Sequence, residues 1–100
     1  MIDLDSKSLK HVQQILKRYL PGVEVKAFGS RVTGKAKQFS DLDLVVLGKN
    51  PIPIQTIHEL KFAFSTSDLP IMIDIVDWHA ISEEFREKIQ ANCETISDSL

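Results

Sequence analysis

The sequence predicts an α/β (α+β) fold in which a small, mostly covered sheet is flanked by helices. Segments with the apolar periodicity of amphipathic helices alternate along the chain with short segments that have the composition of strands. Glycine and proline mark most of the boundaries between these segments. The 100 residues suffice for one hydrophobic core, so we expect a single domain over residues 1–100 and no separate substrate-binding domain.

Three segments carry apolar residues at helical spacing. The first follows Asp5, a residue type favoured at helix N-caps, and ends at a Pro-Gly pair. Its expected buried stripe comprises Leu9, Val12, Ile15, Leu16 and Tyr19. The second covers residues 54–65, where Phe62 lies off the apolar stripe and either covers a second core edge or contacts another chain. The third begins near Ser82. Its expected buried face comprises Ile81, Phe85, Ile89 and Cys93.

Three further segments, residues 23–28, 41–47 and 71–76, have the length and composition of strands. The second ends in a run of four apolar residues, which is typical of a central strand covered on both faces. Residues 29–38 are expected to form a loop and a short polar helix. The tail from Ser97 onward is expected to be loose.

Two acidic residues at the start of the second strand are the first candidates for chemistry. Asp41 and Asp43 are two residues apart, so on a strand their carboxylates project from the same face, about 6–7 Å apart. Paired carboxylates are typical ligands of Mg²⁺, which prefers oxygen donors and is often shared with substrate phosphates. Two such ions would activate the attacking oxygen and stabilise the leaving oxygen of a displacement at phosphorus.

A Gly-Ser pair, separated from these acids by ten intervening residues, lies between the first strand and the short helix. Gly29 can adopt backbone angles closed to other residues and lets a phosphate approach the chain. Ser30 would begin the helix, where free backbone N–H groups and its hydroxyl favour an anion. Taken singly, each fragment is typical of an ordinary turn or cap, but the strand–turn–helix–strand context favours a phosphate and metal site.

Asp74 interrupts the apolar run of the third strand. A lone acid in such a run lies at an edge, is paired, or ligates a metal, and we favour metal ligation or general-base catalysis. Asp77, just past this strand, is expected to cap a helix instead.

Composition excludes several classes of protein. The net charge of −2 gives no general basic surface for nucleic acid, and the only local basic patch runs from Arg31 to Lys37. No apolar run approaches the ~20 residues that span a membrane, and the acidic N-terminus is unlike a secretory signal. The single cysteine, Cys93, cannot form an internal disulfide, so we expect a cytoplasmic protein.

The motif Gly29-Ser30, ten residues, then Asp41-Leu42-Asp43 resembles the signature of the DNA polymerase β-like nucleotidyltransferases, and the short chain resembles their minimal members, the MNT proteins. The resemblance covers roughly the whole chain and implies a mixed sheet with Asp74 as third carboxylate. It implies that Asp41, Asp43 and Asp74 bind Mg²⁺, with two ions, and catalyse transfer from ATP. The implied nucleotide-phosphate contacts are Gly29, Ser30, Arg31 and Ser40. Thr33 departs from the pattern, because relatives often carry a basic residue there, and Arg31, Lys35 or Lys37 would have to compensate.

The MNT resemblance also implies a partner, a HEPN-domain ribonuclease toxin, and the transfer of AMP from ATP to a tyrosine near its active site. Two other hypotheses remain open from the residues. The chain would neutralise its partner by occlusion alone, an alternative kept open by Phe62 and Thr33, or it would transfer a nucleotide to a small molecule.

Overall fold

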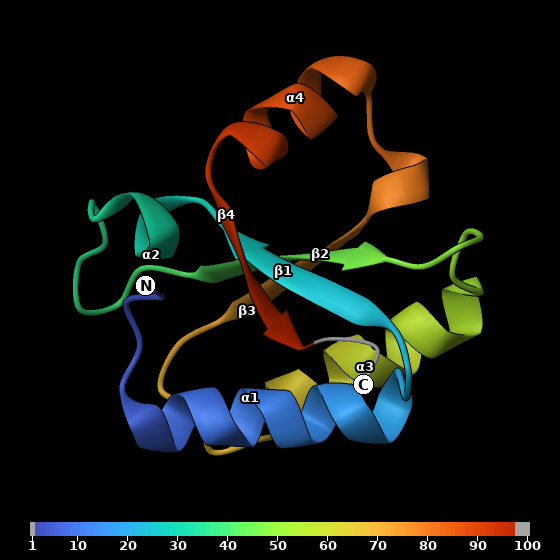
Figure 1. The fold of residues 1–100 in the computed structure, drawn as a ribbon. Helices are drawn as coiled ribbons and strands as arrows, with labels where there is room; N and C mark the ends of the chain where they lie inside the picture. The colour runs from blue at the N-terminus through green and yellow to red at the C-terminus, as the bar shows by residue number, and fades with distance from the viewer. Residues whose placement is uncertain (1, 98–100) are drawn as a thin grey trace.

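The computed structural model describes residues 2–97, which fold into a mixed sheet with helices on both sides (Figure 1). In chain order the elements are α1 (Ser6–Tyr19), β1 (Glu24–Phe28), α2 (Ser30–Thr33), β2 (Leu42–Leu47), α3 (Ile54–Ser65), β3 (Ile73–Asp77), the 3₁₀-helix η1 (Trp78–Ala80), α4 (Glu83–Ala91) and β4 (Cys93–Ser97). The predicted α/β fold class with a small sheet is therefore confirmed. No helix within the described range is both long enough and apolar enough to cross a membrane.

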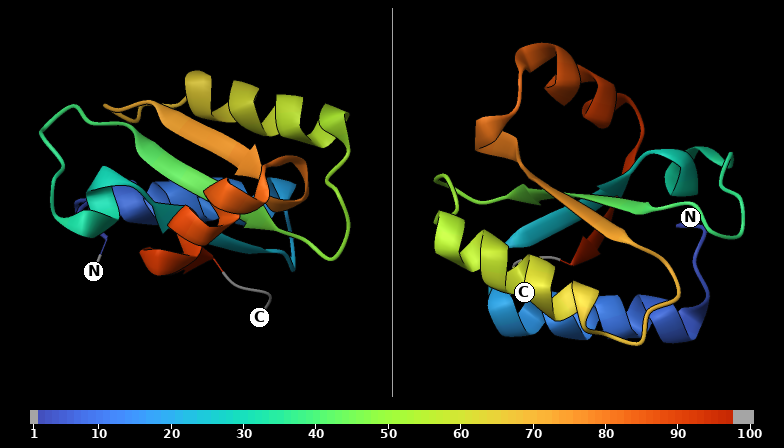
Figure 2. Two further views of the ribbon diagram at one scale, coloured as in Figure 1. Left: turned by 90° about the horizontal axis from the view of Figure 1, so that it is seen from above. Right: turned by 180° about the vertical axis from the view of Figure 1, so that it is seen from behind.

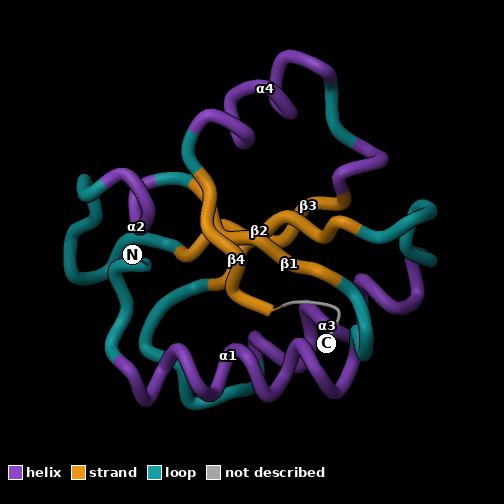
Figure 3. Tube along the Cα trace, viewed as in Figure 1, coloured by secondary structure: helices purple, strands orange, loops and turns teal. Residues whose placement is uncertain are grey.

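The strands are arranged in the order β3-β2-β1-β4 (Figure 3). β1 pairs antiparallel with both β2 and β4, whereas β2 and β3 run parallel, so the sheet is mixed as the family resemblance implied. Strand β2 lies between two neighbours, and its residues Leu44, Val45 and Val46 are all 0% exposed. Because these three alternate between the two faces of the sheet, both faces of β2 are covered, as its apolar sequence predicted.

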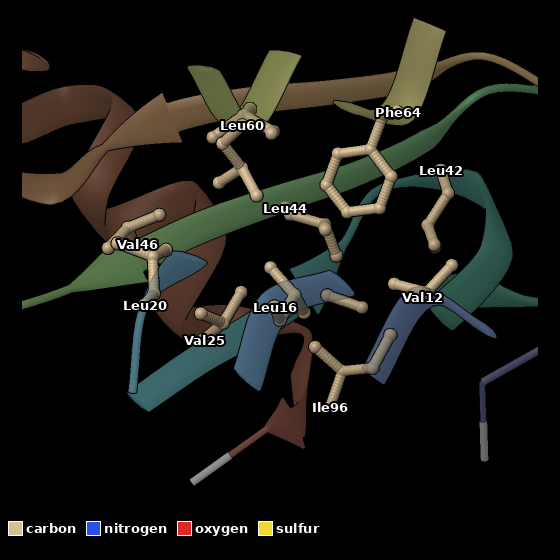
Figure 4. Close-up of a cluster of buried hydrophobic side chains, with 12 residues drawn as sticks. Val12, Leu16, Leu20, Val25, Leu42, Leu44, Val46, Leu60, Phe64 and Ile96 are labelled. Atoms are coloured by element: carbon tan, nitrogen blue, oxygen red, sulfur yellow. The ribbon is translucent and has the colours of Figure 1, made fainter. Parts of the chain in front are cut away.

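The main core lies between one face of the sheet and the helices α1 and α3, which pack side by side beneath it (Figures 1 and 2). Helix α1 contributes its apolar stripe because Val12, Leu16 and Leu20 recur on one side of the helix. Figure 4 shows these side chains interleaved with those of α3 and the strands. The buried partners on those elements are Val25, Ala27, Leu42, Leu44, Val46, Leu60, Phe64, Ile75 and Ile96.

The opposite face of the sheet carries α2 and α4 (Figure 1). Helix α4 packs there through Phe85, whose ring meets that of Phe28 edge to face, with centroids 5.7 Å apart and an interplanar angle of 82°. Ser82 caps α4 by accepting the Phe85 N–H at 3.2 Å. Asp77 accepts the His79 N–H at 3.0 Å and so caps η1, as predicted.

The structure corrects the sequence prediction at the C-terminal end. The sequence predicts Cys93 on the buried face of the last helix and a loose tail from Ser97, but Cys93–Ser97 form β4, and Ser97 is buried. The spacing of Ile89 and Cys93 imitates a helix, yet Asn92 leaves the helical region at φ −149° and pairing with β1 takes over. Residues 98–100 of the predicted tail lie outside the described residues. The predicted helix within 29–38 is also shorter, spanning only Ser30–Thr33.

Candidate active site

The three predicted acids lie at one end of the sheet. Asp43 on β2 is the direct register partner of Asp74 on the parallel strand β3. Directly opposed residues share a face, and the neighbours of Asp43, Leu42 and Leu44, are buried against the α1/α3 core. Asp43 and Asp74 therefore project from the other face. Asp41 lies just before β2 and is exposed.

Burial and the negative charges of this row of acids, Asp41, Asp43 and Asp74, disfavour the ionised form of Asp43. Partial burial raises the pKa of its carboxyl above the usual value of 3.8, and the negative charges of Asp74 and Asp41 raise it further. Two neighbouring carboxylates thus act on the most enclosed member of the group. A bound cation would remove this repulsion, since it favours the ionised form of all three.

The side chains do not stand as a finished metal site. Within residues 2–97, no set of three or more His, Cys, Asp or Glu side chains is arranged to hold a metal ion. The backbone brings the acids to neighbouring positions. Their negative charges repel one another, so the side chains would close around an ion only when its positive charge is present. Their oxygen donors fit Mg²⁺, which keeps several waters and takes few protein carboxylates.

Gly29 lies directly against Asp43. Its backbone has φ +80° and ψ −157°, a combination that is essentially restricted to glycine. A Cβ at this position would collide with Oδ2 of Asp43 and would lie 3.3 Å from its Cγ. The glycine therefore lets the turn after β1 pass close to the central carboxylate, which places the Gly-Ser turn and the acids in one site.

Ser30 is the first residue of α2, as predicted. The N–H groups of Val32 and Thr33 both donate to the carbonyl of Gly29, at 3.0 and 3.1 Å. The preceding amides, those of Ser30 and Arg31, come before the first intrahelical hydrogen bonds, where a helix offers no acceptor of its own. Together with the half-exposed hydroxyl of Ser30, they are suitable donors for a phosphate oxygen.

Arg31 differs from the expectation that its charge contacts phosphate. Its side chain is buried, at 6% exposure, and its guanidinium donates to four backbone carbonyls. Nε donates to the carbonyl of Ser40 at 2.9 Å, and Nη1 donates to that of Asp3 at 2.7 Å. Nη2 donates to the carbonyls of Lys37 and Gln38, at 3.4 and 3.1 Å. Arg31 therefore ties the loop before Asp41 to the N-terminal segment, and its charge is directed inward.

Ser40 shares in that loop. Its hydroxyl oxygen accepts the Lys37 N–H at 2.8 Å and closes a turn two residues before the first strand residue. Lys35 and Lys37 are exposed, and so is Thr33, at the end of α2. Sequence reasoning could not predict that Arg31 anchors this loop, because its acceptor on Asp3 is 28 residues away and is a backbone atom.

Comparison with known proteins places these features in a wider group. Residues 10–99 match the family described as polymerase beta, nucleotidyltransferase. A protein of Haemophilus influenzae that carries the name "Probable protein adenylyltransferase MntA" is 47% identical over 89 residues, which cover 89% of this chain and 78% of that protein.

Solved structures of similar fold include toxin–antitoxin complexes. One, a toxin–antitoxin crystal structure with AMP-PNP, matches with a TM-score of 0.75 and 20% identity over 95% of this chain and 74% of that chain. Another contains tri-AMPylated HEPN toxin of Shewanella oneidensis with MNT antitoxin, and matches with a TM-score of 0.71 and 17% identity over 95% of this chain and 73% of that chain. At these identities the structures establish similarity of fold.

Proposed function

The chain belongs to the polymerase beta nucleotidyltransferase family, and we propose that it transfers AMP from ATP to a hydroxyl group of a partner protein. The proposed acceptor is a tyrosine of a HEPN-domain ribonuclease toxin. Two findings support it: the relative at 47% identity is named as a protein adenylyltransferase, and a complex of similar fold pairs an MNT antitoxin with an AMPylated HEPN toxin. We place the reaction in the cytoplasm, where ATP and such a toxin meet, and assign it to one domain spanning residues 1–100.

The observation that carries the proposal is the register that sets Asp43 opposite Asp74 while Gly29 holds the Gly-Ser turn against Asp43. Asp41, Asp43 and Asp74 would hold Mg²⁺, with two ions at full occupancy. Bound there, the metal would neutralise the phosphate charge that develops during displacement. The raised pKa of Asp43 supports this assignment, because a cation would relieve the repulsion from Asp74 and Asp41.

The phosphate end of ATP would lie at the Gly-Ser turn. The amides at the start of α2 and the hydroxyl of Ser30 would donate to the pyrophosphate oxygens, and the hydroxyl proton of Ser40 would reach the same side. Arg31 would act indirectly, by holding the loop that carries Ser40 and leads into Asp41. Such positioning accounts for much of the rate of a transfer that needs little covalent help from the protein.

In the proposed reaction the tyrosine oxygen attacks the α-phosphorus of ATP, and the bond from that phosphorus to the pyrophosphate oxygen breaks. The phenolic proton passes to Asp74, the carboxylate on the outer strand. Pyrophosphate leaves, and AMP remains esterified to the tyrosine. Asp74 is exposed, so an acceptor group from another protein can approach it.

The direct experiment is to incubate the chain with its genomically neighbouring HEPN protein, ATP and Mg²⁺, and to measure the intact mass of the HEPN protein. We expect the mass to rise by whole AMP units with the natural chain and to stay unchanged with Asp43→Asn. Circular dichroism of the variant establishes that it is folded. Transfer by Asp43→Asn at the wild-type rate would refute the assignment.

One observation supports the occlusion alternative. Phe62 on α3 is 68% exposed, so of the two roles expected for it the structure favours contact with another chain over cover of a core edge. A triple variant of Asp41, Asp43 and Asp74 to Asn separates the two functions. If it still suppresses toxicity in cells, neutralisation works by occlusion; if suppression is lost while binding persists, transfer is required.

A further inference from the structure

Two apolar side chains that are close in sequence to the acids are exposed to solvent. This exposure is unfavourable because their apolar surface stays in contact with water. Phe39 and Met72 are each 73% exposed. Phe39 precedes Asp41 by two residues, and Met72 precedes Asp74 by two residues. Because β2 and β3 run parallel, the segments that lead into these two strands lie at the same end of the sheet (Figure 2). The Leu42 N–H donates to the carbonyl of Met72 at 3.0 Å, which fixes the start of β3 beside that of β2.

Exposure and chain direction place Met72 with Asp74. From residue 72 to 75, exposed Met72 and Asp74 alternate with Ile73 and Ile75, which pack into the core. Side chains two apart on an extended chain share a face, so Met72 stands on the same side of the sheet as Asp74. Phe39 lies in the turn closed by Lys37 and Ser40, where its side chain is exposed two residues before exposed Asp41.

The in-line geometry of the displacement determines from which side of the acids the acceptor approaches. An in-line displacement places the incoming oxygen opposite the leaving oxygen. The Gly-Ser turn meets Asp43 from the β1 side, and with pyrophosphate held there the acceptor must enter from the β3 side. Met72 stands on that side, directly before β3 at the outer edge of the sheet.

We infer that Phe39 and Met72 form the contact surface for the aromatic ring of the acceptor, and so select a tyrosine over an aliphatic hydroxyl. The inference rests on the proposed function and names the part of its site that receives the acceptor. Aromatic rings pair favourably with one another, and a methionine sulfur packs well at a ring edge. A phenol held between these side chains would present its oxygen toward Asp74, whereas a serine would have nothing to fill the apolar surface.

The test compares Phe39→Ala and Met72→Ala with the control Ile54→Ala. Ile54 is similarly exposed, at 72%, but lies on α3. With the neighbouring HEPN protein as acceptor, we expect each site variant to raise the acceptor KM roughly three- to tenfold, as loss of one aromatic contact predicts. Affinity for AMP-PNP, measured by calorimetry, stays unchanged in the site variants, and Ile54→Ala behaves like the natural chain.

A second readout is the preference of the chain for its HEPN acceptor over the same protein with serine at the modified position. This preference falls in the double variant if the ring contact is real. An unchanged acceptor KM overturns the inference. So does an equal loss of AMP-PNP affinity, because the two side chains would then hold the adenine base. If the natural chain transfers no AMP at all, the proposed function fails, and the inference falls with it.

Discussion

Replacing Gly29 with alanine tests whether this glycine lets the Gly-Ser turn lie close to the acids. At φ +80° and ψ −157° the backbone of an alanine is strained by about 1–3 kcal/mol. For a domain of this size each kcal/mol lowers Tm by about 4–8 °C. The added Cβ also meets Oδ2 of Asp43, so the carboxylate must move away from its present position. A shift of about 1 Å in a catalytic group lowers transfer about a hundredfold.

Gly22→Ala is the matched control. Gly22 also has a positive φ, +74°, but a Cβ there has no atom within 4 Å. Backbone strain of about 1–2 kcal/mol should lower its stability without touching the site. Both variants are compared by thermal melting and by AMP transfer at a temperature where each is folded. If Gly29→Ala transferred AMP within threefold of Gly22→Ala, the argument that Gly29 positions Asp43 would be refuted.

Three further predictions follow from the same contacts. Asp43→Asn should abolish transfer yet raise Tm at neutral pH, because burial and the neighbouring acids hold the pKa of Asp43 above 3.8, so that its ionised form destabilises the fold. The gain in Tm should fade as the pH falls through that raised pKa, where the natural carboxyl becomes protonated. A gain in Tm that does not depend on pH would contradict this cause. Arg31→Lys should lose about 2–4 kcal/mol in urea unfolding, because an ammonium cannot donate to four carbonyls at once, and full stability would disprove the loop-anchoring role. Asp77→Ala should lose about 1–2 kcal/mol through its bonds to the N–H groups of Ile52 and His79, while transfer persists; lost transfer in folded protein would show that Asp77 belongs to the site.

The sequence predicted the part of the site that depends on local pattern. The spacing of Asp41 and Asp43 requires only that the chain be extended, and the start of α2 at Ser30 follows from the glycine before it. The break in the apolar run at Asp74 marked an unusual position, and the family resemblance placed it on the strand beside Asp43. The register that makes them direct partners is set by the packing of β3 against α3 and β2.

The contacts that sequence could not predict join distant segments. Strand β4 forms because Cys93–Ser97 find an open edge on β1, and nothing within the segment distinguishes that pairing from one more helical turn. The family resemblance implied that Arg31 contacts phosphate, yet its guanidinium donates to carbonyls of the 37–40 loop and of Asp3. Phe28 and Phe85 meet although 57 residues separate them, because β1 and α4 are brought together by the sheet.

Asp41, Asp43 and Asp74 are proposed to form one cation site, and manganese titration followed by electron paramagnetic resonance measures cation binding at that site. Mn²⁺ takes the same oxygen ligands as Mg²⁺ and its free signal can be counted. In the presence of AMP-PNP, we predict that Asn at any of the three positions weakens Mn²⁺ binding, whereas Asp68→Asn, an exposed acid outside the row, leaves it unchanged. Binding that survives the loss of Asp74, or that weakens equally with Asp68→Asn, would contradict the claim.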